Sequence, residues 1–170
     1  MAVEEFREAL RRVKVEFENS LEEIMLLKDI QKLNLPSGLI ENLKAGTSLR
    51  IYRWAANRLI EKGLAKPVEE ILDLKKVLQL RWKEKNDPGE LQPLPDYFYL
   101  RVKNETPNDE ILPHLKDIYS LRLSKIMSFA AKRIPPSMIE NLTAEEEVLY
   151  EHRLGIVNVW YEFIEEGEEK

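Results

Sequence analysis

The sequence predicts an α+β protein in which a small N-terminal β-rich domain precedes a larger, all-helical bundle domain. Two observations carry this prediction. Roughly the first fifty residues contain short apolar runs separated by turn residues, a pattern typical of strands. The later sequence spaces its apolar residues three and four positions apart, as helices do when they bury one face. We place the domains at residues 1–67 and 68–170.

The N-terminal domain is predicted to contain a short helix followed by three strands. The helix covers residues 2–12, and the first strand covers residues 13–17, where apolar and charged residues alternate as in a half-buried strand. The continuous apolar run at residues 24–27 predicts a second strand. Residues 48–52, which follow a turn at Gly46, predict the third.

A basic helix at residues 53–62 is predicted to complete this domain, because its apolar residues lie one turn apart and Gly63 can form the left-handed C-terminal cap. Its cations, together with one in the preceding strand, give a local positive charge. These residues are Arg50, Arg53, Arg58 and Lys62. They are candidates for contact with DNA phosphate or an acidic partner. A solvated helix face explains the same pattern.

The second domain is predicted to be helical along its length. Ile71, Leu74, Leu78 and Trp82 form one stripe, and the helix that carries it stops at the turn of residues 86–89. A stiff connector with two prolines follows this helix. The segments after the connector are predicted from their caps and their apolar spacing.

Caps mark the remaining helices. Asp96 is a good N-cap for residues 97–100, although this run also fits a strand. A long helix is predicted from residue 108 or 109 to about residue 132, with the wide apolar face of a central bundle helix. Thr143 and Glu146 have the spacing of a capping box, which predicts the start of the last helix.

Aromatic residues in this domain are candidate contacts with a partner. Tyr97 and Phe98 are followed directly by a third aromatic residue, so one helix stripe cannot bury all of them. Trp160 and Phe163 lie on the last helix, where another aromatic residue follows Trp160. Aromatic side chains often anchor interfaces. A core with apolar elements on both sides of each helix is the alternative.

Two cations on the long helix, Arg122 and Lys125, are three residues apart. They are interpreted either as solvated side chains or as a charged contact with a partner subunit. The charged tail from residue 165 to residue 170 is expected to fray.

Composition limits the classes of function. The net charge is −5, which differs from the basic footprint of a dedicated nucleic-acid binder. The chain has no cysteine, no apolar run near the roughly 20 residues of a membrane span, and an acidic N-terminus unlike a signal peptide. These features predict a cytoplasmic protein without a membrane segment.

Motifs for catalysis or metal binding are missing from the sequence. The two histidines, His114 and His152, lie in different predicted helices, without the spacing of a zinc motif. The six glycines are scattered rather than gathered in a phosphate-binding loop, and no serine lies in a nucleophile elbow. We therefore predict a protein that is not an enzyme and that has no metal or cofactor.

Three segments, in order, resemble the GINS family of replication proteins. Residues 46–63, with their Arg-Trp-Ala segment, resemble the small domain, and residues 94–99 resemble the proline–aromatic segment after the connector. The helical-domain signature is resembled by two further stretches. Residues 121–126 supply the Leu-Arg and Lys-Ile pairs, and residues 142–146 supply the Leu-Thr pair and a glutamate. The chain is similar to an archaeal GINS subunit of the type related to the second and third partner subunits of eukaryotic GINS. This similarity spans roughly residues 13–165.

The resemblance implies a scaffold. This GINS type places its small β-rich domain first, and the sibling type reverses that order. Arg53 departs from the proline that many relatives carry before the tryptophan. The implied partners are a sibling GINS subunit in a hetero-tetramer, the replicative helicase and a RecJ-like protein. The implied role is to stabilise and activate DNA unwinding at the fork, without catalysis.

Two other functional classes fit the same sequence. One is a winged-helix-like DNA-binding module with a helical dimerisation tail, which the strands beside a basic helix would support. The other is an unrelated helical adapter or a helical enzyme that uses buried carboxylates.

Overall fold

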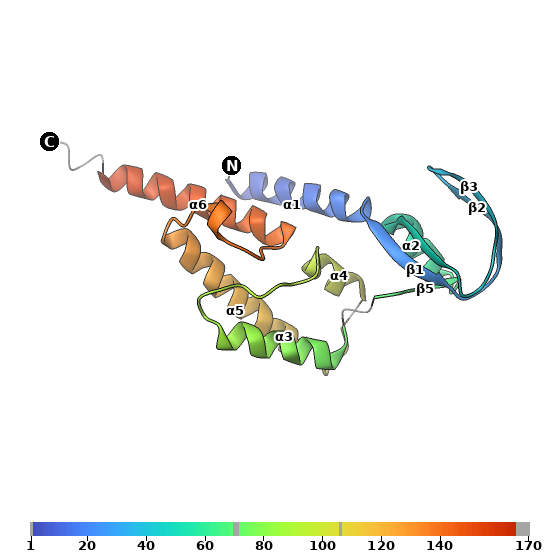
Figure 1. Cartoon of the computed structure of the whole chain (residues 1–170). Coiled ribbons are helices and arrows are strands. Elements are labelled where there is room, and N and C mark those ends of the chain that lie inside the picture. Colours follow the sequence, from blue (N-terminus) through green and yellow to red (C-terminus); the bar gives the residue numbers. More distant parts are fainter. Residues whose placement is uncertain (1, 70–71, 106, 166–170) are drawn as a thin grey trace. The chain divides into compact units, whose positions relative to one another are not determined.

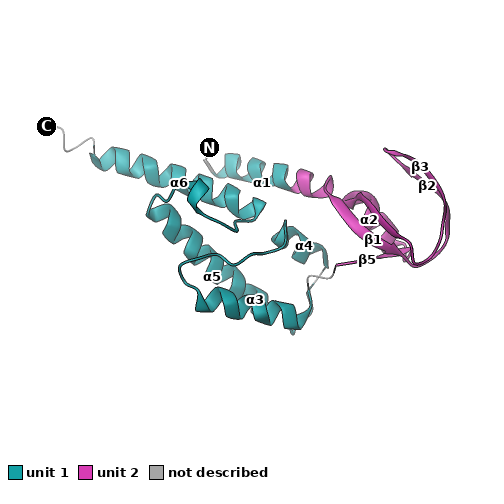
Figure 2. Cartoon of the chain, viewed as in Figure 1, with its two compact units in different colours: residues 1–13, 71–170 teal, residues 14–70 magenta. Residues whose placement is uncertain are grey.

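The computed structural model describes residues 2–69, 72–105 and 107–165. It is a mixed α+β structure with small antiparallel sheets, and it divides into two compact units (Figure 1, Figure 2). A β-rich unit comprises Lys14–Glu70, and a helical unit comprises Met1–Val13 and Ile71–Lys170. The first thirteen residues therefore group with the helical unit, not with the β-rich one in which we placed them.

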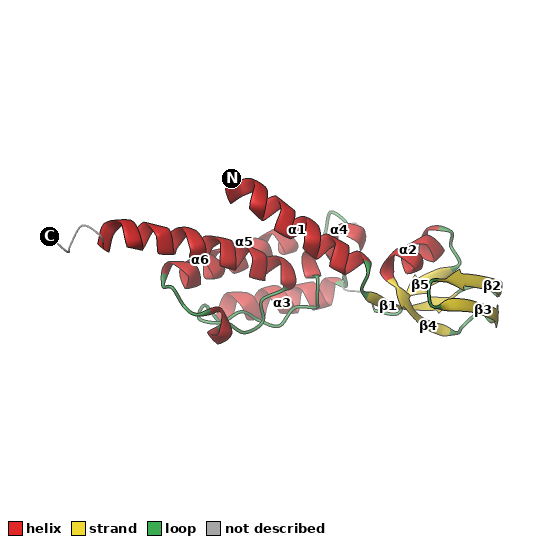
Figure 3. Cartoon of the chain, turned by 90° about the horizontal axis from the view of Figure 1, so that it is seen from above, coloured by secondary structure: helices red, strands yellow, loops and turns green. Residues whose placement is uncertain are grey.

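The β-rich unit is built from short antiparallel strands and one helix (Figure 3). Its elements are β1 (Leu21–Leu26), β2 (Ile30–Leu35), β3 (Gly38–Leu43), β4 (Ser48–Tyr52), α2 (Arg53–Glu61) and β5 (Ala65–Pro67). β1 lies between β4 and β5 in one sheet, and β2 pairs with β3 in a separate hairpin. The predicted strand at residues 48–52 and the helix after it are confirmed, whereas β2, β3 and β5 were not predicted.

The core of this unit follows from alternation along β1. Ile24 and Leu26 lie on one face of the strand and are buried, because successive side chains of a strand point to opposite faces. They belong to the same apolar cluster as Ala56 and Leu59 of α2. Gly63, with a φ of 65°, follows α2 in the left-handed conformation predicted for its C-terminal end.

An ion pair is buried in the same unit. Arg53, the first residue of α2, pairs with Glu22 of β1, and the two side chains are 7% and 8% exposed. The guanidinium of Arg53 also lies 4.2 Å from the centroid of the Phe17 ring, in cation–π geometry. The prediction that Arg53 lies on a solvated or DNA-binding face is therefore wrong, because Glu22 neutralises its charge inside the unit.

Residues 13–17, which we predicted to be a strand, belong to helix α1 (Ala2–Glu18). The alternating pattern fits a helix equally well, because Val13 and Phe17 are four residues apart, which is about one helical turn. Both side chains are buried. Val15, between them, is exposed, which fits the outer face of a helix. The stripe continues the spacing of Phe6 and Leu10, so the helical period runs through the whole segment.

The helical unit contains the first part of α1 and four further helices among the residues described. These helices are α3 (Leu74–Asn86), α4 (Phe98–Glu105), α5 (Leu112–Ala131) and α6 (Ala144–Glu165), with a short 3₁₀ turn at Pro136–Met138. Residues 97–100, for which a strand was also considered, lead into and begin α4. Ile71 of the predicted stripe, and the predicted fraying beyond residue 165, lie outside the described residues.

Side-chain caps set the starts of two helical segments. The Asp73 carboxylate accepts a hydrogen bond from the Lys76 amide at 3.0 Å and caps α3. The Asn108 side chain accepts from the Ile111 amide at 2.9 Å, in the turn that leads into α5. The predicted long helix therefore has its capping residue at position 108 and its first helical residue at Leu112.

Two apolar clusters form the core of the helical unit. One contains Val77, Phe98, Leu115 and Ile118, and joins α3, α4 and α5. The other joins α5 to α6 and to the loop after α3, and contains Leu91, Ile126, Ala130 and Tyr150. No helix within the described parts of the chain is both long enough and apolar enough to cross a membrane.

The buried Arg53–Glu22 pair generates a testable prediction. Changing Arg53 to Met should lower the free energy of unfolding of the β-rich unit by about 3–5 kcal/mol, because the Glu22 carboxylate would stay buried without its cation. Arg50→Met, on an exposed position of β4, is the matched control and should change it by about 0.5 kcal/mol or less.

Urea unfolding followed by the fluorescence of Trp54 measures this effect. Trp54 packs against the core of the β-rich unit, and replacing Trp82 and Trp160 with Phe leaves it as the one tryptophan reporter. Equal unfolding midpoints for the Arg53→Met and Arg50→Met variants would show that the buried pair does not stabilise the unit.

Candidate functional site

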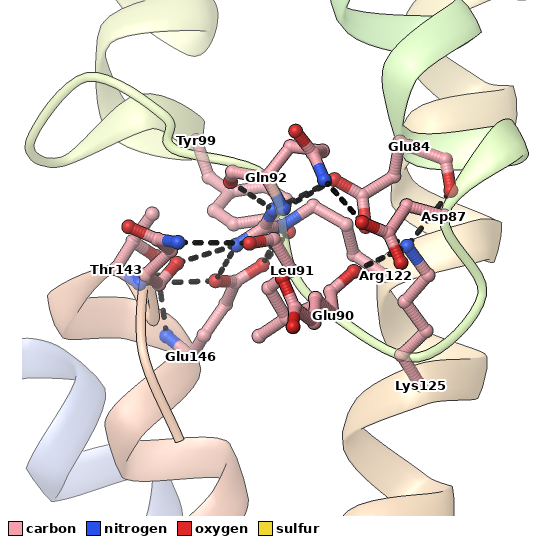
Figure 4. A network of polar contacts seen from close by, with 11 residues as sticks. Glu84, Asp87, Glu90, Leu91, Gln92, Tyr99, Arg122, Lys125, Thr143 and Glu146 are labelled. Carbon is pink, nitrogen blue, oxygen red and sulfur yellow. Dashed lines mark hydrogen bonds and ion pairs between the residues drawn. The ribbon is translucent and has the colours of Figure 1, made fainter. Parts of the chain in front are cut away.

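A network of charged side chains lies inside the helical unit, and Arg122 of α5 is at its centre (Figure 4). The side chain is fully buried. Its Nε and Nη2 donate to the two oxygens of Glu146, at 2.6 and 2.7 Å. Its Nη1 donates to Glu84 at 3.0 Å. The network therefore joins α5 to α6 and to α3.

Backbone carbonyls satisfy the rest of the Arg122 guanidinium. Nη1 also donates to the carbonyl oxygen of Gln92, and Nη2 donates to that of Asn141, both at 2.8 Å. An arginine has five N–H donors, and all five have acceptors here. This completeness matters because an unpaired donor in a dry site costs free energy.

Lys125, one turn further along α5, has an equally complete set of partners. Its Nζ donates to the carboxylate of Glu84 at 2.5 Å, and to the carbonyl oxygens of Glu84 and Glu90 at 2.7 Å each. Glu84 also accepts from the Gln92 amide at 3.1 Å. Lys125 and Glu84 therefore hold the loop after α3 in place.

Glu146 has two roles, as a helix cap and as a counter-ion. It accepts from the Thr143 amide at 3.0 Å, while the Thr143 hydroxyl accepts from the Glu146 amide at 3.4 Å. Both arms of the predicted capping box are thus confirmed. Glu146 also pairs with Arg122 and accepts from the Tyr99 hydroxyl of α4 at 2.5 Å.

The network changes the ionisation of two of its members. Burial raises the pKa of Tyr99, and the negative charge of Glu146 raises it further, so the phenol stays protonated. Burial alone would lower the pKa of Arg122. The hydrogen bonds and charge of Glu146, with the charge of Glu84, outweigh burial and raise it.

Asn141 shapes the loop that closes the network. Its φ of 64° places it in the left-handed region, which asparagine tolerates better than most residues. Its carbonyl accepts from Arg122, and its side-chain amide donates to the carbonyl of Leu91 at 2.9 Å. The loops before α4 and before α6 are therefore tied together by one residue.

This arrangement acts as a clamp between helices. Two cations and two carboxylates neutralise one another, and each is held by hydrogen bonds from several directions. Across the described ranges no group of three or more His, Asp or Glu side chains is placed to hold a metal ion. His114 lies against Arg81, and His152 lies beside the Phe6 ring, with 5.2 Å between ring centroids.

The structure corrects both interpretations of Arg122 and Lys125. The exposures of 0% and 7% exclude solvated cations and exclude an exposed contact with a partner. The inward face of α5 is centred on Ile118, Arg122 and Lys125, whereas the apolar residue Leu123 is 46% exposed. Apolar spacing did not assign Arg122 and Lys125 to the buried face, because these two positions carry charge.

The aromatic candidates fall into two groups. Phe98 is fully buried in the first apolar cluster, and Tyr97 is half-buried just before α4, with a φ of 54°. Trp160 and Phe163 are exposed on α6, with their ring centroids 6.2 Å apart. Phe98 is therefore a core residue, and Trp160 and Phe163 remain candidates for a partner contact.

The remaining cations of the β-rich unit are on its surface. Arg50, Arg58 and Lys62 are exposed, and the Arg58 guanidinium lies 5.9 Å from the Trp54 ring centroid. With Arg53 buried, the predicted basic surface loses one of its four residues. The winged-helix alternative depended on that basic surface. The positive charge of the surface is smaller than the sequence implied, because Arg53 does not contribute to it.

Sequence reasoning missed the partners of Arg122. Glu84 was interpreted only as part of a helix, although it lies seven residues after Val77 and so shares the inward face of α3. That spacing was the available signal. Tyr99 was noted only as one of three adjacent aromatic residues. Its contact with Glu146 spans 47 residues of sequence and left no local pattern.

Comparison with known proteins does not identify a family for this chain. No protein-family model matches the chain, and no curated protein matches it significantly in sequence. The case for function therefore depends on the residues themselves, on the buried clamp and on the exposed faces of the helices.

The clamp predicts a large loss of stability when Arg122 is removed. Arg122→Met should lower the free energy of unfolding by about 3–5 kcal/mol, because Glu84 and Glu146 would stay buried without their shared cation. Arg122→Lys keeps the charge but not the two-pronged pairing with Glu146, so it should lie between this variant and the wild type.

Urea unfolding followed by circular dichroism measures these losses. Lys116→Met, on the exposed side of the same helix, is the matched control, and its unfolding midpoint should stay near that of the wild type. A loss for Arg122→Met as small as that of the control would mean that the clamp does not stabilise the helical unit.

A second prediction concerns alkaline pH. The pKa of Tyr99 is raised in the folded state above the ordinary value of 10.0, so the native protein keeps a proton that the unfolded chain releases. This contribution to stability is present in full below about pH 10 and is lost as the pH rises above it.

Replacing Tyr99 with Phe should therefore reduce the fall in stability between about pH 9 and about pH 11, as measured by urea unfolding midpoints at each pH. Tyr161→Phe, in the same unit, is the control variant. The assignment fails if Tyr99→Phe and wild type lose stability in parallel over this range.

Proposed function

We propose that this chain is a non-catalytic subunit of an archaeal GINS complex, which scaffolds and activates the replicative helicase together with a RecJ-like partner. In this proposal the β-rich unit is the small domain and the helical unit is the assembly domain that follows it. The protein acts in the cytoplasm, in a hetero-tetramer with a sibling GINS subunit.

The observation that carries the proposal is that the residues of the helical-domain signature belong to one hydrogen-bonded network. Arg122 and Lys125, and Thr143 with Glu146, resembled the helical-domain signature while they were separate pieces of sequence. In the folded chain they bond to one another or to the same carboxylates. A signature made of residues that hold a fold together fits a family that shares an architecture rather than an active site.

The exposed surface of the helical unit supports an assembly role. On α6, Val159, Trp160 and Phe163 are 64%, 59% and 71% exposed, and they follow one another at helical spacing. Contiguous apolar surface of this kind on a folded chain marks a site of interaction. Arg50, Arg58 and Lys62 of the β-rich unit are candidates for an acidic partner or for DNA phosphate.

Purification of the tagged protein from its own cells tests the proposal. With nuclease added to remove DNA bridging, a sibling GINS subunit, the replicative helicase and a RecJ-like protein should elute with it. A tagged chain that elutes without any of these three proteins would contradict the proposal, and salt-dependent DNA binding would then be the property to measure.

Variants of α6 test its part in assembly. Trp160→Glu combined with Phe163→Glu should reduce recovery of these partners about tenfold or more, because two charges replace an apolar contact. Met138→Glu introduces a charge at a position that is 72% exposed elsewhere in the helical unit, and should leave recovery unchanged. Equal recovery of the partners with both variants would show that α6 is not part of the interface.

A further inference from the structure

A cavity of about 300 Å³ opens on the helical unit, and its lining comes from α1, α4, α5 and α6. This volume is near the lower end of the roughly 300–1,000 Å³ that ligand pockets occupy. All of its lining residues belong to residues 1–13 or 71–170, so the cavity lies within one compact unit. Tyr99 and Glu146 of the clamp form part of its wall.

Three aromatic rings line the cavity, and they belong to Phe6, Tyr99 and Tyr119. The Tyr99 and Tyr119 rings have centroids 5.2 Å apart and planes inclined by 44°, so they form two walls that meet at an angle. The hydrogen bond to Glu146 holds Tyr99 in this position. The Phe6 ring packs on His152. Ring faces attract cations, and alkylated ammonium groups are the ligands that such aromatic walls bind best.

A carboxylate with an unmatched oxygen also lines the cavity. Glu145 lies in the first turn of α6, and its Oε1 accepts from the Leu100 amide at 3.2 Å. Its Oε2 is buried and has no hydrogen-bond partner among the residues that the structure describes. An unpaired carboxylate oxygen out of water costs free energy, and a cationic N–H donor would recover it. Both oxygens of the adjacent Glu146 are already bonded to Arg122.

These groups together indicate the chemistry of a ligand. The ring faces favour methyl groups on a cationic nitrogen, while Glu145 requires that this nitrogen keep an N–H. A dimethylammonium group has both properties. A trimethylammonium group has no N–H, and an unmethylated ammonium group is strongly hydrated and has no methyl groups to bury.

The opening of the cavity suits an alkyl chain. Leu123 and Leu149 belong to the lining, and Leu123 is 46% exposed, which places it at the rim. A chain of a few methylene groups that runs from the nitrogen to the surface would contact these apolar side chains, and burying it is favourable.

We propose that this cavity binds a dimethylammonium group at the end of an alkyl chain, the group that a dimethylated lysine side chain carries. The nitrogen donates its N–H to Glu145 Oε2, and its methyl groups lie against the three aromatic rings. The inference goes beyond the proposed function and does not depend on it, because it concerns a site that the clamp and the exposed face of α6 do not use.

Calorimetric titration of the full chain tests the site with ligands that differ only at one nitrogen. The probes are N-acetyl-lysine methylamides whose side-chain nitrogen carries no, two or three methyl groups. The dimethyl probe should bind about tenfold or more tightly than either of the others, because it alone satisfies both the rings and the carboxylate. Its methyl protons should also move upfield in the NMR spectrum on binding, since they would lie over ring faces.

A free amine distinguishes the two sources of this head group. N,N-dimethylbutylamine has the same chain and nitrogen without the amino acid. Binding of the lysine probe alone would assign the cavity to a side chain of a partner protein, and equal binding of both would show that a free alkylamine is also a ligand. Each result supports a dimethylammonium site, whereas failure of both compounds to bind would overturn it.

A matched pair of variants tests the role of the carboxylate. Glu145→Gln keeps the size of the side chain and an acceptor for the Leu100 amide, but removes the charge. It should weaken binding of the dimethyl probe about tenfold and narrow its advantage over the trimethyl probe. Glu147→Gln makes the same change of charge at an exposed position of α6 and should leave both values unchanged. Circular dichroism shows whether each variant is folded.

A second variant tests the cavity without altering the carboxylate. Leu123→Trp enlarges a side chain at the rim, so it should block entry and abolish binding of the dimethyl probe. A dimethyl probe that binds no better than unmodified lysine, or equally to wild type and to Glu145→Gln, would overturn the inference. Recovery of partners with the tagged chain is a separate measurement, so that failure would leave the proposed function standing.

Discussion

The helical unit is organised by the need to satisfy one buried guanidinium. Burying Arg122 is favourable only when its five donors and its charge are all matched, and this requires groups from α3, α6 and two loops. The capping box of α6, the left-handed turn at Asn141 and the inward position of Glu84 each supply part of that set. Apolar clusters on either side provide most of the burial, while the network determines how the helices align.

Local patterns predicted the parts of the fold whose cause is local. The capping box, the strand before α2 and the glycine after it all depend on neighbours within a few residues, and all were found. The segment at residues 13–17 shows the limit of such patterns, because five alternating residues fit both periods. Only the longer stripe that begins at Phe6 distinguishes a helix from a strand there.

The clamp could not be predicted because its pairs are distant in sequence. Arg122 meets Glu84 across 38 residues and Glu146 across 24, and nothing in a single helix marks which cation will find a buried partner. The apolar stripes of α3 and α6 show a further limit, because Leu78 and Trp82 on α3, and Val159 and Phe163 on α6, are exposed. A stripe shows that a helix has an apolar face, but it does not show whether the covering surface belongs to the same chain.

The clamp also affects how the helical unit responds to heat. Hydration of charged groups becomes less favourable as temperature rises, so the cost of removing Arg122, Lys125, Glu84 and Glu146 from water falls on warming. Stabilisation from apolar burial levels off over the same range. A helical unit fastened by buried ion pairs therefore keeps more of its cohesion at high temperature than a unit of the same size with a purely hydrocarbon interior.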